Sequence, residues 1–158
     1  MVFDLCNGDF EREFAREILA HIRTVDILIN NAGYLVNKSF EELTAEDVDN
    51  VYKTNITSVF KLVKALLPYM GKAEHPTHIV NISSIGGFQG SSKFPGLSAY
   101  SSSKAALASL TECLAEEFKG RNIAVNCLAL GAVQTEMFSK AFPGERAPML
   151  PLQRGKYV

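Results

Sequence analysis

The sequence predicts an α/β protein built around a parallel β-sheet. Three short apolar runs, at residues 25–29, 78–82 and 123–128, have the length and the β-branched content of buried parallel strands. Longer segments with apolar residues at every third or fourth position lie between these runs. Strands and helices that alternate in this way form βαβ units, which place their strands in parallel.

Three helical segments are expected. The first covers residues 10–22 and carries one apolar stripe, formed by Phe10, Phe14, Ile18, Leu19 and Ile22. The second covers residues 44–70, opens with a capping-box-like Thr-Ala-Glu-Asp sequence and contains Pro68 near its end, where a helix tolerates proline or stops. The third covers residues 98–119, with an apolar stripe formed by Leu107, Leu110, Cys113, Leu114 and Phe118.

Small polar residues or glycine follow each predicted strand. The first strand leads into Asn-Asn-Ala-Gly at residues 30–33, the second ends in Ser83 and Ser84, and the third leads into Gly131. One such ending is typical of an ordinary turn. Because ligands of open α/β sheets bind beyond the carboxyl ends of the strands, three such endings predict one shared crevice.

Tyr100 and Lys104 form the most informative pair of ionisable residues. A separation of four residues places both side chains on one face near the start of the third helix. A phenol has an unperturbed pKa of about 10, and a nearby positive charge lowers it. The pair is therefore a candidate acid/base if a cleft surrounds it. The same spacing is also common on solvated helices, so the assignment depends on the polar strand ends around it.

The order Asn-Asn-Ala-Gly, Ser-Ser, Tyr-x-x-x-Lys and Gly-x-Val-x-Thr, within residues 1–145, resembles the classical short-chain dehydrogenases/reductases. The resemblance implies a Rossmann-type sheet and transfer of a hydride between NAD or NADP and an alcohol or carbonyl substrate. It makes Tyr100 the general acid/base, while Lys104 lowers its pKa and holds the nicotinamide ribose. Ser84 would bind the substrate oxygen, and Asn55 would anchor a water of the proton relay.

The same motif positions imply a set of cofactor-binding residues. They are Asp4, Leu5, Asn31, Ala32, Gly33, Ile82, Tyr100, Lys104, Gly131, Val133 and Thr135. In this set Asp4 matches the acidic residue that contacts adenine in the family.

Residue chemistry supports the same reaction independently. Reduction of a carbonyl builds negative charge on its oxygen, so the site needs a hydrogen-bond donor and a proton source. A serine hydroxyl and a phenol supply these, and the hydride comes from a cofactor because no side chain donates one. Ser84 has an alternative role as a strand-end turn residue. Asn55 is either a water-holding kink or a tolerated polar residue inside a helix.

The departures from the family pattern indicate a shortened member. The glycine-rich Gly-x-x-x-Gly-x-Gly turn is absent, so we expect a partial, doubly wound parallel sheet without the first two βα units and the last strand. At about 30 residues for a βαβ unit, the missing part is on the order of 60 residues. Residues 1–158 would then form a single incomplete Rossmann-type domain, truncated at both ends. Its first strand would be residues 2–5, which either lack a neighbour or move into the vacant slot beside residues 26–30.

Two local differences from the family also stand out. Leu130 occupies the position that is usually proline before the glycine. Ser84 lies further from Tyr100 than is usual, through an insertion around residues 91–93. The glycine- and serine-rich loop at residues 86–96 is expected to be mobile.

Composition narrows the choice of partners and compartment. An apolar content of 47% supports one core, and a net charge of −1 without a basic stripe argues against nucleic acid and anionic membranes. Cys6, Cys113 and Cys127 are widely spaced, which indicates free thiols in a reducing, cytoplasmic compartment. No signal peptide, membrane span or metal-ligand spacing is recognised.

Two functions stay open. One is an NAD(P)-dependent oxidoreductase acting on a small alcohol or carbonyl substrate, which the loop at residues 134–148 would cover. The other is a catalytically silent member of the family that acts through protein–protein contacts. The resemblance implies a homo-oligomer assembled through the helices at 44–70 and 98–119. The sequence chooses neither NAD nor NADP, and it does not identify the substrate.

Overall fold

The three predicted strands form one parallel sheet. The computed structural model describes residues 3–72 and 74–157. Within them, β1 (Ile27–Asn30), β2 (Thr77–Ser84) and β3 (Ile123–Leu130) pair in the order β1-β2-β3. The expected α/β class with a Rossmann-like parallel sheet is thus confirmed, and β1 is an edge strand as expected from the sequence.

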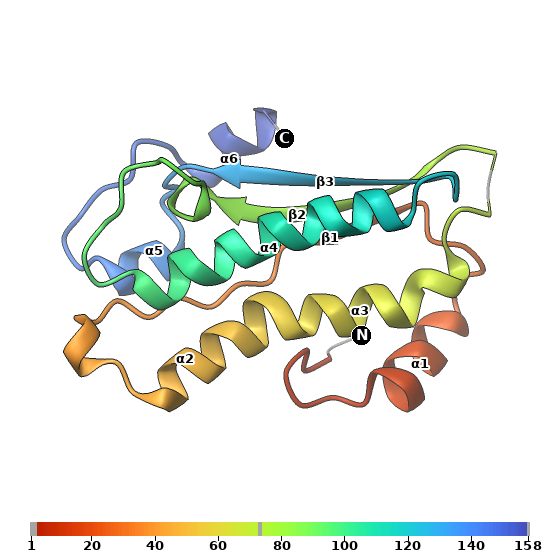
Figure 1. Cartoon of the computed structure of the whole chain (residues 1–158), viewed down its shortest axis with the longest axis horizontal. Coiled ribbons are helices and arrows are strands. Elements are labelled where there is room, and N and C mark those ends of the chain that lie inside the picture. The colour runs from red at the N-terminus through yellow and green to blue at the C-terminus, as the bar shows by residue number, and fades with distance from the viewer. Residues whose placement is uncertain (1–2, 73, 158) are drawn as a thin grey trace.

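The helices alternate with the strands along the chain (Figure 1). The predicted helix at 44–70 is one line of consecutive segments, with a π-helical segment in the middle and a 3-10 turn at Pro68. The predicted helix at 10–22 is a π-helical segment followed by a short α-helix that ends at Leu19. The helices and π-helical segments are Phe10–Phe14, α1 (Ala15–Leu19), α2 (Ala45–Tyr52), Lys53–Thr57, α3 (Ser58–Leu66), α4 (Ser98–Glu117), α5 (Glu136–Ala141) and α6 (Pro151–Arg154).

The core lies between one face of the sheet and helices α3 and α4. Leu28 of β1, Ile79 of β2 and Val125 of β3 are buried in one cluster with Val63 of α3 and Leu107 of α4. These strand residues point to the same face because side chains alternate along a strand and paired residues of neighbouring strands share a face. Burial of this face holds the helices against the sheet.

The opposite face of β1 is open. Ile27 and Ile29, which alternate with the buried Leu28, are 63% and 57% exposed. Parallel sheets are normally covered on both faces. Among the described residues, α3 and α4 pack on one face, and these isoleucines stay in contact with solvent.

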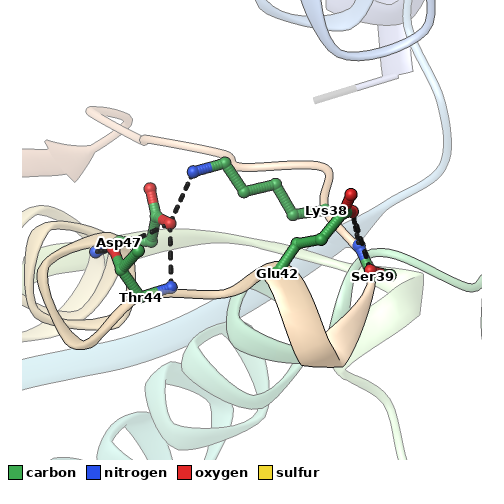
Figure 2. A network of polar contacts seen from close by, with 5 residues as sticks. All are labelled: Lys38, Ser39, Glu42, Thr44 and Asp47. Carbon is green, nitrogen blue, oxygen red and sulfur yellow. Dashed lines mark hydrogen bonds and ion pairs between the residues drawn. The ribbon is translucent and has the colours of Figure 1, made fainter.

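Two consecutive capping boxes order the chain between β1 and α2 (Figure 2). The Ser39 hydroxyl donates to Glu42 Oε2 at 2.7 Å, and the Thr44 hydroxyl donates to Asp47 Oδ2 at 2.9 Å. The Lys38 ammonium also donates to Asp47 Oδ2, at 2.6 Å. This bond, followed by the bonds from Thr44, lowers the pKa of Asp47 to about 2. The start of α2 is therefore fixed by charge-assisted hydrogen bonds.

The strand predicted at residues 2–5 is wrong for the described residues 3–5, and Val2 lies outside the described part. These residues form no pair with the sheet. Instead, the ring centroid of Phe3 lies 5.0 Å from those of both Phe10 and Phe14. Without a strand beside it, the segment buries its apolar side chains against the first helical segment rather than in a sheet. It does not move into the slot beside β1.

Candidate functional site

The predicted catalytic residues come from separate elements that meet near the carboxyl ends of the strands. β2 and β3 point the same way, toward the side of the molecule where α5 and the loop at residues 86–97 lie (Figure 1). Ser84 is the last residue of β2, and Tyr100 and Lys104 belong to the first turns of α4. Asn55 lies in the π-helical segment between α2 and α3, and Gly33 follows β1.

The Ser84 hydroxyl lies close enough to the Tyr100 phenol to influence its pKa. Burial raises the pKa of the Tyr100 phenol, and the hydrogen bond with Ser84 partly offsets this by lowering it. The Ser84 oxygen also accepts the backbone N–H of Gly86 at 3.2 Å. The serine is therefore both a strand-end turn residue and a partner of the phenol.

Lys104 lies beside the ring of Tyr100. Its Nζ is 5.7 Å from the centre of the Tyr100 ring and donates to the carbonyl of Ile82 at 2.8 Å. Burial lowers the pKa of the Lys104 ammonium, and the charge of the Cys127 thiolate form raises it. Burial of the phenol is the largest influence on the pKa of Tyr100, and the role of Lys104 in lowering that pKa stays a prediction.

Asn55 cross-links the loop after β1 to helix α4. Its side chain is 1% exposed; Oδ1 accepts the N–H of Tyr34 at 2.8 Å, and Nδ2 donates to the carbonyl of Tyr34 at 3.0 Å. Nδ2 also donates to Ser103 Oγ at 2.9 Å, and this hydroxyl donates to the carbonyl of Tyr100 at 2.7 Å. These bonds exclude one of the two alternatives that the sequence left open for Asn55, namely that it is merely a tolerated polar residue inside a helix. Asn55 sits in a π-helical kink, and its role in holding a water stays a prediction.

The Asn-Asn-Ala-Gly segment passes beside this cluster. A Cβ added at Gly33 would lie 3.7 Å from both Asn55 Oδ1 and Lys104 Nζ. Asn31, Ala32 and Gly33 are exposed, so their backbone is open to a ligand at the point where the predicted cofactor would pass. The segment after β1 and the start of α4 thus share one site.

The residues after β3 are placed at the same end of the sheet. A Cβ at Gly131 would lie 3.2 Å from Arg154 Nη2, a contact with α6 that sequence reasoning missed. Val133 pairs with Met149 in an isolated parallel bridge. The Thr135 hydroxyl accepts a backbone N–H at 3.2 Å and caps α5. Their contacts with a cofactor stay predictions.

Asp4 and Leu5 occupy different surroundings from those predicted. Asp4 accepts hydrogen bonds from the N–H of Cys6 at 2.8 Å and from the side chain of Asn7 at 3.0 Å. The bond from Cys6, then those from Asn7, lower the pKa of Asp4. Asn7 in turn accepts from Lys53 Nζ at 2.8 Å, so this turn lies beside the π-helical segment instead of ending a strand. Leu5 packs against the edge of the core.

Two serines that sequence reasoning passed over hold the site together. The buried Ser83 hydroxyl donates to the carbonyl of Lys104 at 2.8 Å, which ties the end of β2 to α4. Ser103, also buried, joins Asn55 to the backbone of Tyr100. Their only signal in the sequence is their position next to Ser84 and Lys104, and a run of serines is equally typical of an exposed helix start.

Two cavities flank the site. The smaller, of about 430 Å³, is lined by Gly33, by the residues that follow it and by α5, including Met137. The Glu136–Lys140 ion pair, 2.6 Å long, belongs to its wall. The larger, of about 620 Å³, lies between Phe40, the loop at 86–97 and the outer side of α4. Because Gly33 adjoins Lys104, the smaller cavity is the candidate entrance for a substrate.

The parallel sheet, with a hydroxyl, a phenol and an ammonium near the carboxyl ends of its strands, defines a Rossmann-type protein. A sequence model described as short chain dehydrogenase matches residues 1–146. The chain belongs to this family. The family expectation from the sequence motifs is confirmed.

Similar proteins agree with this assignment. The chain is 36% identical over 137 residues to nodulation protein G of Rhizobium sp. (strain N33), covering 87% of this chain and 54% of the relative. It is 34% identical over 139 residues to the 3-oxoacyl-[acyl-carrier-protein] reductase FabG of Thermotoga maritima, covering 88% and 55%. The chain thus spans about half the length of the curated relatives it matches.

Solved structures show the same fold. A short chain dehydrogenase from Escherichia coli CFT073, complexed with NADPH, superposes with a TM-score of 0.87 at 28% identity, covering 99% of this chain and 65% of that chain. A gluconate 5-dehydrogenase from Burkholderia cenocepacia, in complex with NADP and tartrate, gives a TM-score of 0.78 at 27% identity, covering 88% and 53%. In the described ranges 3–72 and 74–157, no helix has the length and apolar character needed to cross a membrane.

Proposed function

We propose that the protein is an NAD(P)-dependent oxidoreductase that interconverts a small alcohol and the corresponding carbonyl compound. The observation that carries the proposal is the placement of Ser84 at the end of β2 beside Tyr100 of α4, with Lys104 Nζ 5.7 Å from the centre of the Tyr100 ring. A hydroxyl and a phenol held together at a strand end supply the donor and the proton that a developing alkoxide needs. The polar endings of three neighbouring strands support the same conclusion.

The proton chemistry favours reduction at neutral pH. Because burial raises the pKa of Tyr100, the phenol keeps its proton and acts as the general acid toward the substrate oxygen. When a substrate binds, the single proton of the Ser84 hydroxyl turns from the phenol to the substrate oxygen and stabilises the negative charge that develops there. Asn55 acts at a distance from the reacting atoms, because its bonds to Tyr34 and Ser103 fix the position of α4.

The residues present fit the nicotinamide half of a dinucleotide. The Lys104 ammonium has three N–H groups, of which the carbonyl of Ile82 takes one, so two are free to bind ribose hydroxyls. Gly33 has no side chain at the point where a Cβ would approach both Lys104 and Asn55, which leaves room for a ring or a ribose. A bound nicotinamide would supply or accept the hydride. NADP and NADPH in two related structures support either NAD or NADP as the cofactor.

The substrate class follows from the smaller cavity. Its wall combines the apolar Met137 with the polar Asn37 and the charged Glu136 and Lys140. Such a wall suits a small alcohol or ketone that carries polar groups. The names of the relatives, a 3-oxoacyl reductase and a gluconate 5-dehydrogenase, are consistent with oxygenated substrates of this kind.

Cofactor binding and turnover test the proposal separately. Titration with NADPH and NADH, followed by reduced-nicotinamide fluorescence, should show saturable binding. With a panel of small ketones and hydroxy acids, Tyr100→Phe should lower kcat by about 100-fold or more, because the general acid is lost. Tyr69→Phe, at the end of the α3 segment, is the matched control and should keep its activity. Unchanged turnover of the Tyr100 variant would refute the assigned mechanism.

A second candidate function is a catalytically silent member of the family that acts through protein contacts. The exposed Ile27 and Ile29 on the open face of β1 favour this reading. An absence of binding at millimolar cofactor, with the chain folded, would support it. We further propose a homo-oligomer assembled through α2–α3 and α4, since Phe60 of α3 is 54% exposed, and a cytoplasmic location for the protein.

A further inference from the structure

One lysine organises the loop that follows Ser84. The ammonium of Lys93 donates to the carbonyls of Gly86 at 2.8 Å and Phe88 at 2.6 Å, and to the hydroxyl of Ser91 at 2.9 Å. Because an ammonium has three N–H groups, all of them are used within this loop. The backbone of the loop is thereby held in a compact hydrogen-bond network.

Ser91 adds further hydrogen bonds to the same network. Its hydroxyl lies 2.6 Å from the carbonyl of Ile85 and 2.8 Å from that of Phe88, while it also receives the bond from Lys93. The loop at 86–96, expected from its composition to be mobile, thus carries a dense set of hydrogen bonds. Ser91 and Lys93 belong to the insertion that separates Ser84 further from Tyr100 in the sequence, so the family motifs do not predict this network.

This hydrogen-bond network contacts the turn that follows Ser84, the proposed catalytic serine. Gly86 and Gly87 are buried, and a Cβ on Gly87 would lie 2.6 Å from backbone atoms of both Lys104 and Ala105 in α4. The turn is therefore held between Lys93 on one side and α4 on the other. From this position, the N–H of Gly86 donates to Ser84 Oγ at 3.2 Å.

We propose that Lys93 is a positioning residue that orients the Ser84 hydroxyl toward Tyr100 by fixing the turn at Gly86. With one lone pair of Ser84 Oγ engaged by the N–H of Gly86, the hydroxyl proton is directed toward the phenol oxygen. The Ser84–Tyr100 bond counteracts the effect of burial on the pKa of Tyr100. The catalytic meaning of this orientation rests on the proposed function, but the orientation itself does not.

The readout is the hydrogen-bonding state of the Tyr100 hydroxyl at neutral pH. Tyrosines labelled with ¹³C at Cζ give an NMR resonance that responds to hydrogen bonding of the phenol, and Tyr100→Phe assigns the signal. Ser84→Ala should shift this resonance, because it removes the partner. Lys93→Met should shift it in the same direction by at least half as much. Lys93→Arg, which keeps a cation and several donors, should restore most of the original position.

Two comparisons separate a positioning role from a general effect on folding. Ser92→Ala, an exposed neighbour in the same loop, should leave the Tyr100 resonance in place. The double variant S84A/K93M should show the shift of S84A alone, because Lys93 acts through the serine. A folded K93M with an unmoved resonance, or a double variant whose shift is the sum of the two single shifts, would overturn the proposal.

A second variant covers the case in which K93M does not fold. Lys93→Gln keeps two neutral donors and should give a shift between those of the wild type and S84A. An unmoved resonance in folded K93Q overturns the proposal equally. None of these measurements requires turnover, so an active Tyr100→Phe enzyme would refute the proposed function while leaving the inference about Lys93 untouched.

Discussion

At the scale of single residues, hydrogen bonds between buried amide and hydroxyl side chains link the strands to helix α4. Asn30 Nδ2 donates to Asn81 Oδ1 at 2.7 Å, and Asn81 Nδ2 donates to Thr111 Oγ1 at 2.9 Å. All three residues are buried, so each bond satisfies groups that would be costly to leave unpaired. This network connects β1 to β2 and β2 to α4.

Ser103 offers the sharpest test at this scale. Ser103→Ala removes an acceptor of Asn55 Nδ2 and a donor to the carbonyl of Tyr100, both in a buried site. We expect the free energy of unfolding to fall by about 1–3 kcal/mol, because buried polar groups lose a partner. Urea denaturation measures the change.

The neighbouring serine is the matched control. The hydroxyl of Ser102 bonds to the carbonyls of Ser98 and Ala99, but the residue is exposed and water can replace these bonds. Ser102→Ala should change the free energy of unfolding by less than roughly 0.5 kcal/mol. Equal losses in the two variants would contradict the structural role given to Ser103.

At the scale of elements, the 3-10 turn Ile85–Gly87 and helix α4 fit together only because Gly87 has no side chain. A Cβ at this position would meet Ala105 N and Lys104 C, each at 2.6 Å. These are backbone atoms within a helix, so they cannot turn aside as a flexible side chain can. The close approach sets the distance from the end of β2 to α4, which carries the predicted catalytic residues Tyr100 and Lys104.

Replacing this glycine should therefore push the two elements apart. Gly87→Ala is expected to lower the free energy of unfolding by about 1–3 kcal/mol through overpacking, and to weaken cofactor binding through the shift of Lys104. Gly155→Ala is the control, since a Cβ there has nothing within 4 Å. Denaturation and nicotinamide fluorescence report the two effects; a Gly87→Ala protein as stable as Gly155→Ala would contradict the packing argument.

The start of α2 gives a pH-dependent prediction. Asp47 has a pKa of about 2 instead of 3.8, chiefly because it accepts a hydrogen bond from Lys38 and then from Thr44 (Figure 2). A carboxyl with a lowered folded-state pKa contributes stability above its unfolded pKa and loses it as the pH falls through its folded pKa. The stabilisation by Asp47 should thus be complete above about pH 4 and should disappear as the pH falls toward 2.

Asp47→Asn isolates this contribution. At neutral pH the variant should unfold at a lower urea concentration than the wild type, and the difference should shrink as the pH falls from about 4 to 2. Asp49→Asn, on the exposed side of the same helix, should show a smaller difference at neutral pH. A gap between wild type and Asp47→Asn that persists unchanged at the acid end would rule out the ion pair as its source.

At the scale of the whole molecule, β1 has one covered and one open face within the described part of the chain. Leu28 is buried in the core, whereas Ile27 and Ile29 on either side of it are mainly exposed on an edge strand. Exposed apolar residues on an unpaired edge favour association with other chains. The described chain is therefore expected to self-associate through this face as its concentration rises.

Paired threonine substitutions test this expectation. Ile27→Thr with Ile29→Thr keeps the β-branched shape that suits a strand while adding hydroxyls, so self-association should fall with little loss of stability. Light scattering and sedimentation at increasing concentration measure the effect. Leu28→Ala, by contrast, should destabilise the fold by about 2–5 kcal/mol, because it opens a cavity. Association that persists in the threonine variant would show that another surface is responsible.

Periodicity and motif order were enough to predict most of this fold. The runs at 78–82 and 123–128 fall within β2 and β3, and the predicted helices at 44–70 and 98–119 are present. These elements could be predicted because the spacing of apolar residues within each segment indicates its type. The strand predicted at 2–5 was wrong for the described residues 3–5, since a strand forms only where another strand accepts its hydrogen bonds. No local pattern contains that information.

The sequence by itself determined the class of protein and predicted the site residues Asn55, Ser84, Tyr100 and Lys104, because residue types and their order along the chain carry the family pattern. Only the tertiary structure decided their electrostatics. The pKa of Tyr100 is raised because the phenol is partly buried, and this burial depends on packing between elements distant in sequence. The same packing brings Asn55 to Ser103, and the fold of the 86–96 loop places Lys93 against the turn beside Ser84.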